Sequence, residues 1–314
     1  MGTRSGCSDC KKIAVSEIPE KIRQMLRERE DARAARDFAR ADEIRDELAA
    51  AGYEIRDTPG GAVVERAKAY ETVDPNTISS TLDESADVEF SFHLLYEGFP
   101  EDVDRFLEGL AKNCDLSTSE VVIVDNGSKD ADRIEGWARD RTRVIHLDRE
   151  VGWAAARNAG LKGARGEIVV LVDLSIEPIG DILAPLRDAL ADRSVGLAGP
   201  FGLVSESMRE WEPSAGPEVD ALEGYLIATR RGLLAEGLLS EKFKWYRNAD
   251  IDLSFQVRAQ GRKAVVVPLP VEKHVHRGWD ALNETERAKR SKRNHYLFFD
   301  RWKGRHDLLI SHRH

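Results

Sequence analysis

Cysteine is scarce in this sequence, with three residues among 314, and their number is odd. A sparse, odd set does not form a disulfide framework, which indicates a reducing compartment. Long apolar runs are also missing: none approaches the ~20 residues that span a bilayer, and the first residues lack the apolar stretch of a signal peptide. We therefore expect a cytoplasmic protein with no transmembrane segment.

Positive charge is in short supply overall, because 47 Lys and Arg stand against 56 Asp and Glu, for a formal net charge of -9. An acidic average argues against a protein that coats nucleic acid, although a local basic face is compatible with it. Hydrophobic residues make up 41% of the chain, enough for one large domain or two smaller ones.

Residues 1–18 contain one C-x-x-C pair, Cys7 and Cys10. Such a pair supplies half of a zinc site, but no second Cys or His pair follows at finger-like spacing. The other interpretation, which we adopt, is an exposed and flexible tail.

Residues 19–71 form a first module. Its first part is rich in Ala, Arg, Glu and Leu, and apolar residues recur there at helical spacing, which predicts two amphipathic helices ended by Gly52. The segment YEIRDTPGGAVVER then indicates two short strands joined by a Pro-Gly-Gly turn. Residues 72–87, rich in Ser, Thr and Asp, predict a linker.

In residues 88–314, short β-like runs alternate with helical ones, the pattern of a mostly parallel sheet covered by helices. The expected strands are residues 90–96, 121–124, 144–147, 168–172, 196–198 and 264–267. The expected helices are residues 103–112, 134–139, 153–162, 182–190 and 251–260. Ligands collect at the carboxyl ends of the strands in such sheets, so the residues after each run are candidates for a site.

Polar side chains follow two of these apolar runs. The run EVVIVDNGSKD stops at Asp125, which taken alone favours an ordinary Asx-turn that closes a strand. A later segment places Gly152, Arg157 and Asn158 at the start of a helix and Asp173 at the end of another apolar strand. Together with Asp125, this combination predicts one site. The residues of this set are Asp125, Asn126, Ser128, Gly152, Arg157, Asn158 and Asp173.

This order of motifs resembles glycosyltransferase family 2, whose members show V-D-[ND]-x-S, then G-x-x-x-A-R-N-x-G, then a strand that ends in D-x-D. The likeness runs from about Glu89 to about Trp302, through a Gly-containing strand, a paired Arg, an acidic segment, and V-x-P followed by histidine. It implies a GT-A fold, which is Rossmann-like with helices on both faces of the sheet. It also implies inverting transfer of a sugar from a nucleotide diphosphate to a hydroxyl acceptor.

The resemblance assigns the set above to the nucleotide-sugar side. Asp125 would contact the base, a uracil, and Arg157 would lie against the nucleotide or its diphosphate, where a guanidinium donates charge-assisted hydrogen bonds. Asp173 would face a Mn²⁺ or Mg²⁺ ion that neutralises the leaving diphosphate. We therefore expect a UDP-sugar as donor.

The sequence departs from the family at the metal motif, which is Asp173-Leu174-Ser175 instead of D-x-D. One formal charge is missing, so metal affinity should fall. Either Glu177 or His276 could compensate, with His274 as the competing histidine, and we take Asp173, Ser175 and His276 as the metal set.

Asp250 matches the family's general base, although Ala249 replaces the Glu that usually precedes it. A carboxylate there accepts the proton of the attacking hydroxyl, and a helix start would stabilise its anion. A plain N-cap is the alternative role. The resemblance assigns the acceptor side to Gly224, Tyr225, Trp245 and Asp252.

The first module resembles the C-terminal portion of cysteinyl-tRNA synthetases, through the run EREDARAARDFARADEIRDELAAAGYEIRDTPGGAVVER. No H-I-G-H, K-M-S-K-S or zinc-ligand set is present, which excludes cysteine activation. The resemblance implies RNA or protein docking by residues 19–71. A second hypothesis follows, motivated by Ser175 and Ala249: an inactive core that binds nucleotide and docks to tRNA or another partner, with a homo-oligomer left open.

Two further segments have open interpretations. Residues 202–217, rich in Gly, Ser and Pro, are either a mobile loop over the donor or ordinary surface. Residues 286–302 predict a basic helix with an aromatic face, which is either a solvated helix or a surface for phosphorylated lipid or RNA.

Overall fold

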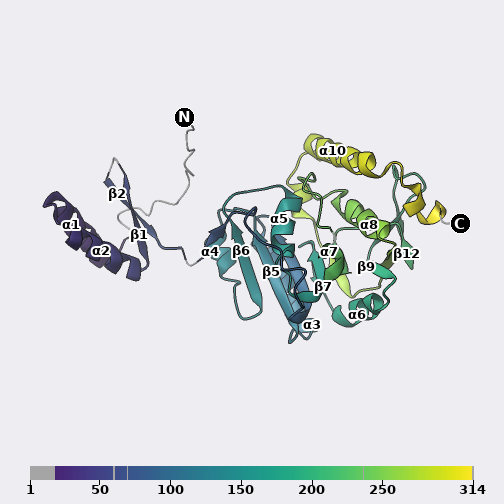
Figure 1. Ribbon diagram of the computed structural model, residues 1–314, viewed down its shortest axis with the longest axis horizontal. Coiled ribbons are helices and arrows are strands. Elements are labelled where there is room, and N and C mark those ends of the chain that lie inside the picture. The colour runs from purple at the N-terminus through teal and green to yellow at the C-terminus, as the bar shows by residue number, and fades with distance from the viewer. Residues whose placement is uncertain (1–17, 59–60, 69, 236, 313–314) are drawn as a thin grey trace. The chain divides into compact units, whose positions relative to one another are not determined.

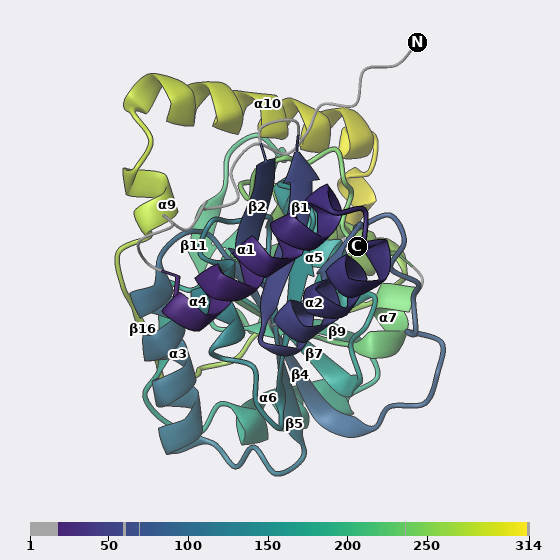
Figure 2. The same ribbon diagram turned by 90° about the vertical axis from the view of Figure 1, so that its left-hand side faces the viewer.

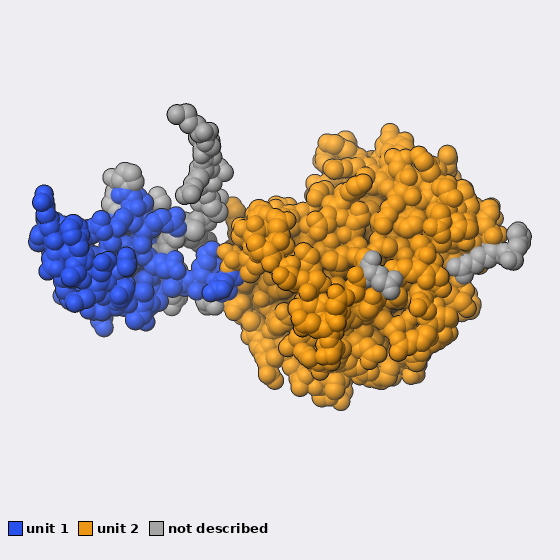
Figure 3. Space-filling view, viewed as in Figure 1, with its two compact units in different colours: residues 1–71 blue, residues 72–314 orange. Residues whose placement is uncertain are grey.

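Figure 1 shows the computed structural model, which describes residues 18–58, 61–68, 70–235 and 237–312. The chain divides into two compact units, residues 1–71 and residues 72–314 (Figure 3). Cys7 and Cys10 lie outside the described residues. Ile18, at the end of the expected tail, is buried in the core of the smaller unit.

The smaller unit is a helical hairpin followed by a β-hairpin, as predicted. Its elements are α1 (Glu20–Ala34), α2 (Phe38–Ala50), β1 (Tyr53–Thr58) and β2 (Gly61–Arg66). The helices turn at Arg36, whose φ is 61°, and Asp37 caps α2 by accepting a 3.1 Å hydrogen bond from Arg40 N. Ile22, Ile44 and Leu48 form a small core with the hairpin.

A nine-stranded sheet forms the centre of the larger unit. In spatial order its strands are β12 (Glu218–Val219), β15 (Lys263–Val266), β9 (Val195–Gly199), β14 (Leu226–Arg230), β7 (Gly166–Val172), β4 (Val88–Tyr96), β5 (Ser119–Asp125), β6 (Thr142–Leu147) and β3 (Thr72–Val73). From β7 to β3 all neighbours are parallel, whereas β14 runs antiparallel to both β7 and β9. The fold class predicted from the sequence is confirmed.

Helices cover both faces of this sheet. They are α3 (Pro100–Asn113), α4 (Ala131–Glu135), α5 (Trp153–Leu161), α6 (Leu183–Ala191), α7 (Arg231–Ala235), α8 (Ala249–Ala259) and α10 (Glu284–Trp302). Alternate residues of β7 point to opposite faces, so Val169 and Leu171 pack with α5, α8 and α10, while Val170 packs with α3 and α6. Both views place α10 and α6 on opposite sides of the sheet (Figures 1 and 2).

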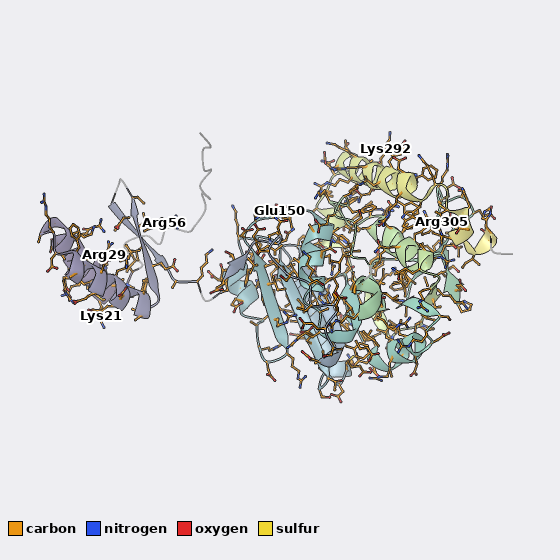
Figure 4. The ribbon with its side chains drawn as sticks, viewed as in Figure 1. Lys21, Arg29, Arg56, Glu150, Lys292 and Arg305 are labelled. Carbon is orange, nitrogen blue, oxygen red and sulfur yellow. The ribbon has the colours of Figure 1, made fainter. Side chains whose placement is uncertain are left out.

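The helix α10 is amphipathic, as its sequence predicts. Phe298 and Trp302 are buried, while Lys292 and Tyr296 are exposed, and Figure 4 labels Lys292 on this helix. No helix in the described ranges is both long enough and apolar enough to cross a bilayer.

Residues 72–87 belong to the larger unit and do not form the expected linker. β3 pairs with β6, Leu82 is buried in the main core, and Arg231 donates a 2.7 Å hydrogen bond to Glu84 O. A strand of two residues is too short to carry a periodic signal, which explains why composition alone indicated a linker.

Residues 202–217, expected as a loop, contain two short strands. β10 (Gly202–Val204) pairs with β11 (Glu212–Ser214) and with β13 (Ala221–Leu222), and Met208 is buried in the main core. A separate hairpin-like pair, β8 (Ile176–Pro178) and β16 (Val271–Lys273), follows the end of β7. Both small sheets lie next to strand ends where ligands are expected.

Candidate active site

A cavity of about 420 Å³ opens where β7 ends and β14 begins. Because β14 is antiparallel to β7, these two ends lie at the same edge of the sheet. Of the residues predicted from the sequence, Asp173, Gly224, Tyr225, Asp250 and His276 line the cavity. Residues up to about 100 positions apart in the chain thus meet at one place.

Asp250 lies in the first turn of α8 and is held by two backbone amides. Gly224 N donates a 2.8 Å hydrogen bond to Asp250 Oδ2, and Ile251 N donates a 2.9 Å bond to Oδ1. The N-cap of this helix is Asn248, whose φ is 63°, so capping is not the role of Asp250. Its carboxylate faces the cavity instead.

Burial dominates the ionisation of Asp250. It raises the pKa of this carboxyl to about 6, although the two backbone hydrogen bonds and the nearby Arg247 act in the opposite direction. We expected the helix start to favour the anion, and desolvation outweighs that effect. A carboxylate with a pKa near 6 is ionised at neutral pH and is a stronger base than an ordinary aspartate.

Asp173 follows β7 and is the second carboxylate of the cavity. Ser175 donates hydrogen bonds from N and from Oγ to Asp173 Oδ1, at 2.9 and 2.5 Å, and His276 Nε2 lies 3.0 Å from Oδ2. Burial acts to raise the pKa of Asp173, but His276 and Ser175 together hold it below its ordinary value. Ser175 therefore orients Asp173, and its hydroxyl proton is already donated.

His276 precedes the short helix α9 (Arg277–Asp280) and caps it. Its Nδ1 accepts a 3.0 Å hydrogen bond from Trp279 N, so in the neutral ring the proton sits on Nε2 and faces Asp173. The ring stacks on Tyr246 at 4.6 Å between centroids. Burial lowers the pKa of His276, and Asp173 more than offsets this, so the net shift is upward.

The competing residues of the metal motif are paired with each other. His274 Nε2 lies 2.8 Å from Glu177 Oε2, and His274 N donates a 2.7 Å hydrogen bond to Ser175 O. Neither residue lines the cavity. Of the two histidines considered, the one at the cavity is His276.

Sequence reasoning missed Glu97, which directly follows β4. Desolvation of its carboxyl and the neighbouring Asp173 raise the pKa of Glu97 to about 7, although the residue as a whole is exposed. It lines a small recess together with Asp173, Ser175 and His276. An acidic residue at a strand end was the available signal, and the motif comparison did not include it.

Two donors for a metal ion converge at this place, Asp173 Oδ2 and His276 Nε2. In the part of the chain that the structure describes, no group of three or more His, Cys, Asp or Glu side chains could hold a metal ion. With only two protein donors, a carboxylate oxygen and an imidazole nitrogen, a bound cation would have to take its other ligands from a substrate and from water.

Arg157 does not reach the cavity wall. Its Nη1 and Nη2 donate 2.7 Å hydrogen bonds to His93 O and Val172 O, which ties the end of β7 to β4, and its guanidinium lies against the Trp153 ring at 5.3 Å. Burial lowers its pKa, and Glu97 and Asp173 partly offset the effect. Arg157 thus supports the strand ends beneath the site, and its contact with a diphosphate stays a prediction.

Asn158 and Gly152 also serve the scaffold. Asn158 exchanges hydrogen bonds with Leu239, at 2.9 Å to Leu239 O and 3.1 Å from Leu239 N. Gly152 precedes α5 at a close approach, since a Cβ there would lie 2.2 Å from Lys244 Cδ. Together they attach the segment around residues 239–244 to α5, and this segment leads into the cavity.

The end of β5 is closed by its own hydrogen bonds. Asp125 is buried, with Oδ2 2.8 Å from His146 Nδ1 and Oδ1 accepting from Ser128 N at 2.9 Å. Asn126 pairs with Val151 through bonds of 2.8 and 2.9 Å. Asp125 thus caps the turn after the strand and does not line the cavity that holds Asp173 and Asp250, and its contact with a base stays a prediction.

Two residues expected on the acceptor side, Trp245 and Asp252, do not line this cavity. Asp252 is buried and fixes α10, since it accepts 2.7 Å hydrogen bonds from Arg301 Nη1 and Trp302 Nε1. Trp245 is buried and stacks on Trp279 at 5.7 Å, so Trp279 lines the cavity and Trp245 supports it.

Arg247 is the basic residue of the cavity wall that sequence reasoning missed. It is exposed, and its guanidinium lies 5.0 Å from the centre of the Trp279 ring. Tyr246, the preceding residue, lines the same wall and adds an aromatic ring to it. No motif marks this loop, because its residues are placed by contacts with α5 and α9.

Two family models match parts of the chain. The family model described as glycosyl transferase family 2 matches residues 96–249, and the one described as cysteinyl-tRNA ligase anticodon binding domain matches residues 15–64. The cysteine–tRNA ligase of Nitratidesulfovibrio vulgaris (strain DP4) is 67% identical over 43 residues, which are 14% of this chain and 9% of the ligase. The chain thus spans less than a tenth of that relative's length.

Two solved structures share the fold of the larger unit. GalNAc-T7 with UDP, GalNAc and Mn²⁺ gives a TM-score of 0.58 at 17% identity, over 70% of this chain and 49% of that one. The mannosyltransferase PcManGT from Pyrobaculum calidifontis with GDP-Man and Mn²⁺ gives 0.53 at 20% identity, over 77% and 72%. Residues 96–249 therefore form a glycosyltransferase family 2 domain within a unit of GT-A fold.

Proposed function

We propose that the larger unit transfers a sugar from a nucleotide diphosphate sugar, with UDP as the leaving group, to a hydroxyl acceptor with inversion at the anomeric carbon. The observation that carries this proposal is that Asp173 and Asp250 line the same cavity. Asp173 lies beside the recess that Glu97 and His276 line, and Asp250 lies at the start of α8. A donor and an acceptor can then meet between them.

Asp250 is the general base in this mechanism. Its carboxylate takes the proton of the acceptor hydroxyl, while the oxygen attacks the anomeric carbon and the bond from that carbon to the diphosphate breaks. Attack from the face opposite the leaving group inverts the configuration. The hydrogen bonds from Gly224 N and Ile251 N fix the carboxylate, so little reorganisation is needed when the proton moves.

The donor side is formed by Asp173, His276 and Arg247. Asp173 and His276 would hold a divalent cation, which supplies charge neutralisation of the leaving diphosphate. A nitrogen donor favours Mn²⁺ over Mg²⁺, which prefers oxygen, and the two structural neighbours contain Mn²⁺. Because Arg247 lines the cavity, its guanidinium would donate hydrogen bonds to phosphate oxygens of the donor.

His276 can free its Nε2 atom for a metal ion by moving the ring proton to Nδ1. Trp279 N also lies 2.9 Å from His276 O, so this amide keeps an acceptor when the proton moves. The neutral ring then binds a metal ion without losing a proton, whereas an imidazolium ring must release one, so metal binding should strengthen as the pH rises.

The test is release of UDP from UDP-sugars with Mn²⁺ in the presence of a panel of simple glycosides, with the anomeric configuration of the product read by proton NMR. Asp250→Asn should lower turnover at least about 100-fold and leave UDP binding intact. Asp188→Asn, at an exposed site on α6, is the matched control and should behave as the wild type. A product of retained configuration, or normal turnover by Asp250→Asn, contradicts the proposal.

The second candidate is a nucleotide-binding protein without turnover that docks to tRNA through its smaller unit. The 67% identity to a cysteine–tRNA ligase segment favours it, as do Ser175 and Ala249. Calorimetry with UDP would then show binding while no sugar donor is consumed. In gel-shift tests total tRNA would retain the full chain and not a chain that starts at Thr72, where β3 begins.

A further inference from the structure

A second cavity, of about 370 Å³, lies at the edge of the main sheet opposite the one described above. Glu167 in its wall is the second residue of β7, whereas Asp173 directly follows the last. A strand of this length spans about 20 Å, so the two cavities are well separated. Four arginines line this second cavity, Arg193, Arg230, Arg231 and Arg262, and we refer to it as the arginine cavity.

Backbone carbonyls hold three of these guanidinium groups in place. Arg230 donates to Leu190 O at 2.8 Å and to Val195 O at 2.6 Å, and it is 9% exposed. Arg231 Nη2 donates to Glu84 O at 2.7 Å, and Arg262 Nη1 donates to Arg193 O at 2.8 Å. Carbonyl oxygens orient a guanidinium without neutralising it, so the groups are fixed and keep their full charge.

The carboxylates near these guanidinium groups lie beyond ion-pair distance. Within the ranges that the structure describes, none of the four arginines forms an ion pair with Asp or Glu. The cavity lining carries four arginines against two carboxylates, Glu84 and Glu167, and the nearby Asp192 partly offsets the charge of Arg230. Burial and the neighbouring Arg193 and Arg262 lower the pKa of Arg230, as expected where like charges crowd together.

We propose that the arginine cavity binds a small anion with a diphosphate group, or with two phosphate groups. Guanidinium groups recognise phosphate oxygens through paired, charge-assisted hydrogen bonds, and fixed guanidinium groups lose little entropy when they do so. The cavity volume lies in the range of small-molecule sites.

Such a ligand would also touch the segment that precedes β4. Leu82, Glu84 and Ala86 form part of the wall, and Arg231 holds this segment through Glu84 O. Binding should therefore slow amide hydrogen exchange in residues 81–86. This readout is independent of sugar transfer and of the cavity around Asp250.

The experiment is calorimetric titration of the full chain with sodium pyrophosphate, at fixed ionic strength and without divalent cations. Arg193 is exposed, and its side chain makes no hydrogen bond in the described ranges, so Arg193→Gln should fold normally. Arg193→Gln and Arg262→Gln should each weaken pyrophosphate binding at least about fivefold, and the double variant should abolish it. Glu167→Gln should tighten binding, because it removes a repelling carboxylate.

Two control variants separate this site from others. Arg139→Gln, at an exposed arginine far along the sheet, should bind pyrophosphate like the wild type. No divalent cation is added, so the diphosphate site proposed beside Asp173 lacks its metal ion, and Arg247→Gln should leave pyrophosphate binding at the arginine cavity in place. Unchanged binding by the double variant, loss of binding through Arg247→Gln, or no binding by the wild type at millimolar pyrophosphate each overturns the proposal. Pyrophosphate and inorganic phosphate run side by side tell whether one phosphate group suffices.

Discussion

Gly224 N donates a 2.8 Å hydrogen bond to Asp250 Oδ2, and this bond joins the residues before β14 to the first turn of α8. The approach is close, because a Cβ on Gly224 would lie 3.2 Å from Asp250 Cβ. Residue 224 must therefore be small for the carboxylate to stay in place. The position of the proposed base thus depends on a backbone atom 26 residues earlier.

The first prediction concerns the pH dependence of turnover. Burial raises the pKa of Asp250 to about 6, and only the ionised carboxylate can accept a proton. The rate kcat/KM should fall about tenfold for each unit of pH below 6 and should level off above it. A profile measured from pH 4.5 to 8 with the donor at low concentration checks this. A plateau that extends to pH 4.5 would assign the base to a different group.

The second prediction concerns stability at the same residue. The folded-state pKa of Asp250 lies above the ordinary value of 3.8, so the folded protein binds more protons than the unfolded one between these values. Its contribution to stability is therefore present at low pH and is lost as pH rises through about 6, by up to about 3 kcal/mol.

Asp250→Asn removes this penalty, because a neutral amide replaces the buried anion. Urea unfolding at pH 5 and pH 8 should show a stability gain that is larger at pH 8. Asp188→Asn on the surface of α6 serves as the control. Equal effects at both pH values would show that Asp250 is not an ionised buried group.

The third prediction concerns Ser175, where the family motif has an acidic residue. Ser175→Asp places a second carboxylate beside Asp173 in a site where Ser175 is 3% exposed. Repulsion should lower the melting temperature in EDTA by several degrees, and Mn²⁺ should restore it. Ser175→Ala should also lower the melting temperature, because Asp173 loses the hydrogen bond from the Ser175 hydroxyl, but Mn²⁺ should not restore it. Identical Mn²⁺ responses of the two variants would argue against a cation at Asp173.

The strand ends are the part of the site that the sequence predicts well. Asp173 and Asp250 come after apolar runs or at a helix start, and local periodicity is enough to place them at one edge of the sheet. The two-residue strand β3 has no period to detect, so composition alone predicts a linker there.

The uses of Arg157 and Asn158 could not be predicted in the same way. Arg157 bonds to His93 O, 64 residues away, and Asn158 bonds to Leu239 O, 81 residues away. Motif spacing shows which side chains stand at a helix start, but it does not show which distant carbonyl reaches them. The same long-range packing places Arg247 on the cavity wall, and no local sequence pattern indicates this position.

The fourth prediction concerns Asp252, which was expected near the acceptor. Because it accepts hydrogen bonds from Arg301 and Trp302, Asp252→Asn should detach the end of α10 and lower the free energy of unfolding by about 2 kcal/mol. The KM for donor and acceptor should stay unchanged in the folded protein. Chemical denaturation and steady-state kinetics measured on the same preparation distinguish the two roles. An altered acceptor KM at full stability would return Asp252 to the acceptor side.

The last prediction compares two arginines as ligands of the diphosphate: Arg157, which the family pattern favours, and Arg247, which lines the cavity. Arg247 is exposed on the cavity wall, so Arg247→Gln should raise the KM for the nucleotide sugar about tenfold or more with little change in stability. Arg157 is 4% exposed and bonded to His93 O and Val172 O, so Arg157→Gln should instead unfold at lower urea concentration.

The comparison is informative because both variants remove one guanidinium and add the same amide. Calorimetric affinity for UDP in Mn²⁺, measured beside urea midpoints, separates a lost ligand contact from a weakened scaffold. Should Arg157→Gln lose UDP affinity at an unchanged midpoint while Arg247→Gln binds normally, the diphosphate would lie beneath Trp153 and not beside Trp279. The donor would then enter from the α5 side of Asp173, and the assignment of Arg247 would have to be withdrawn.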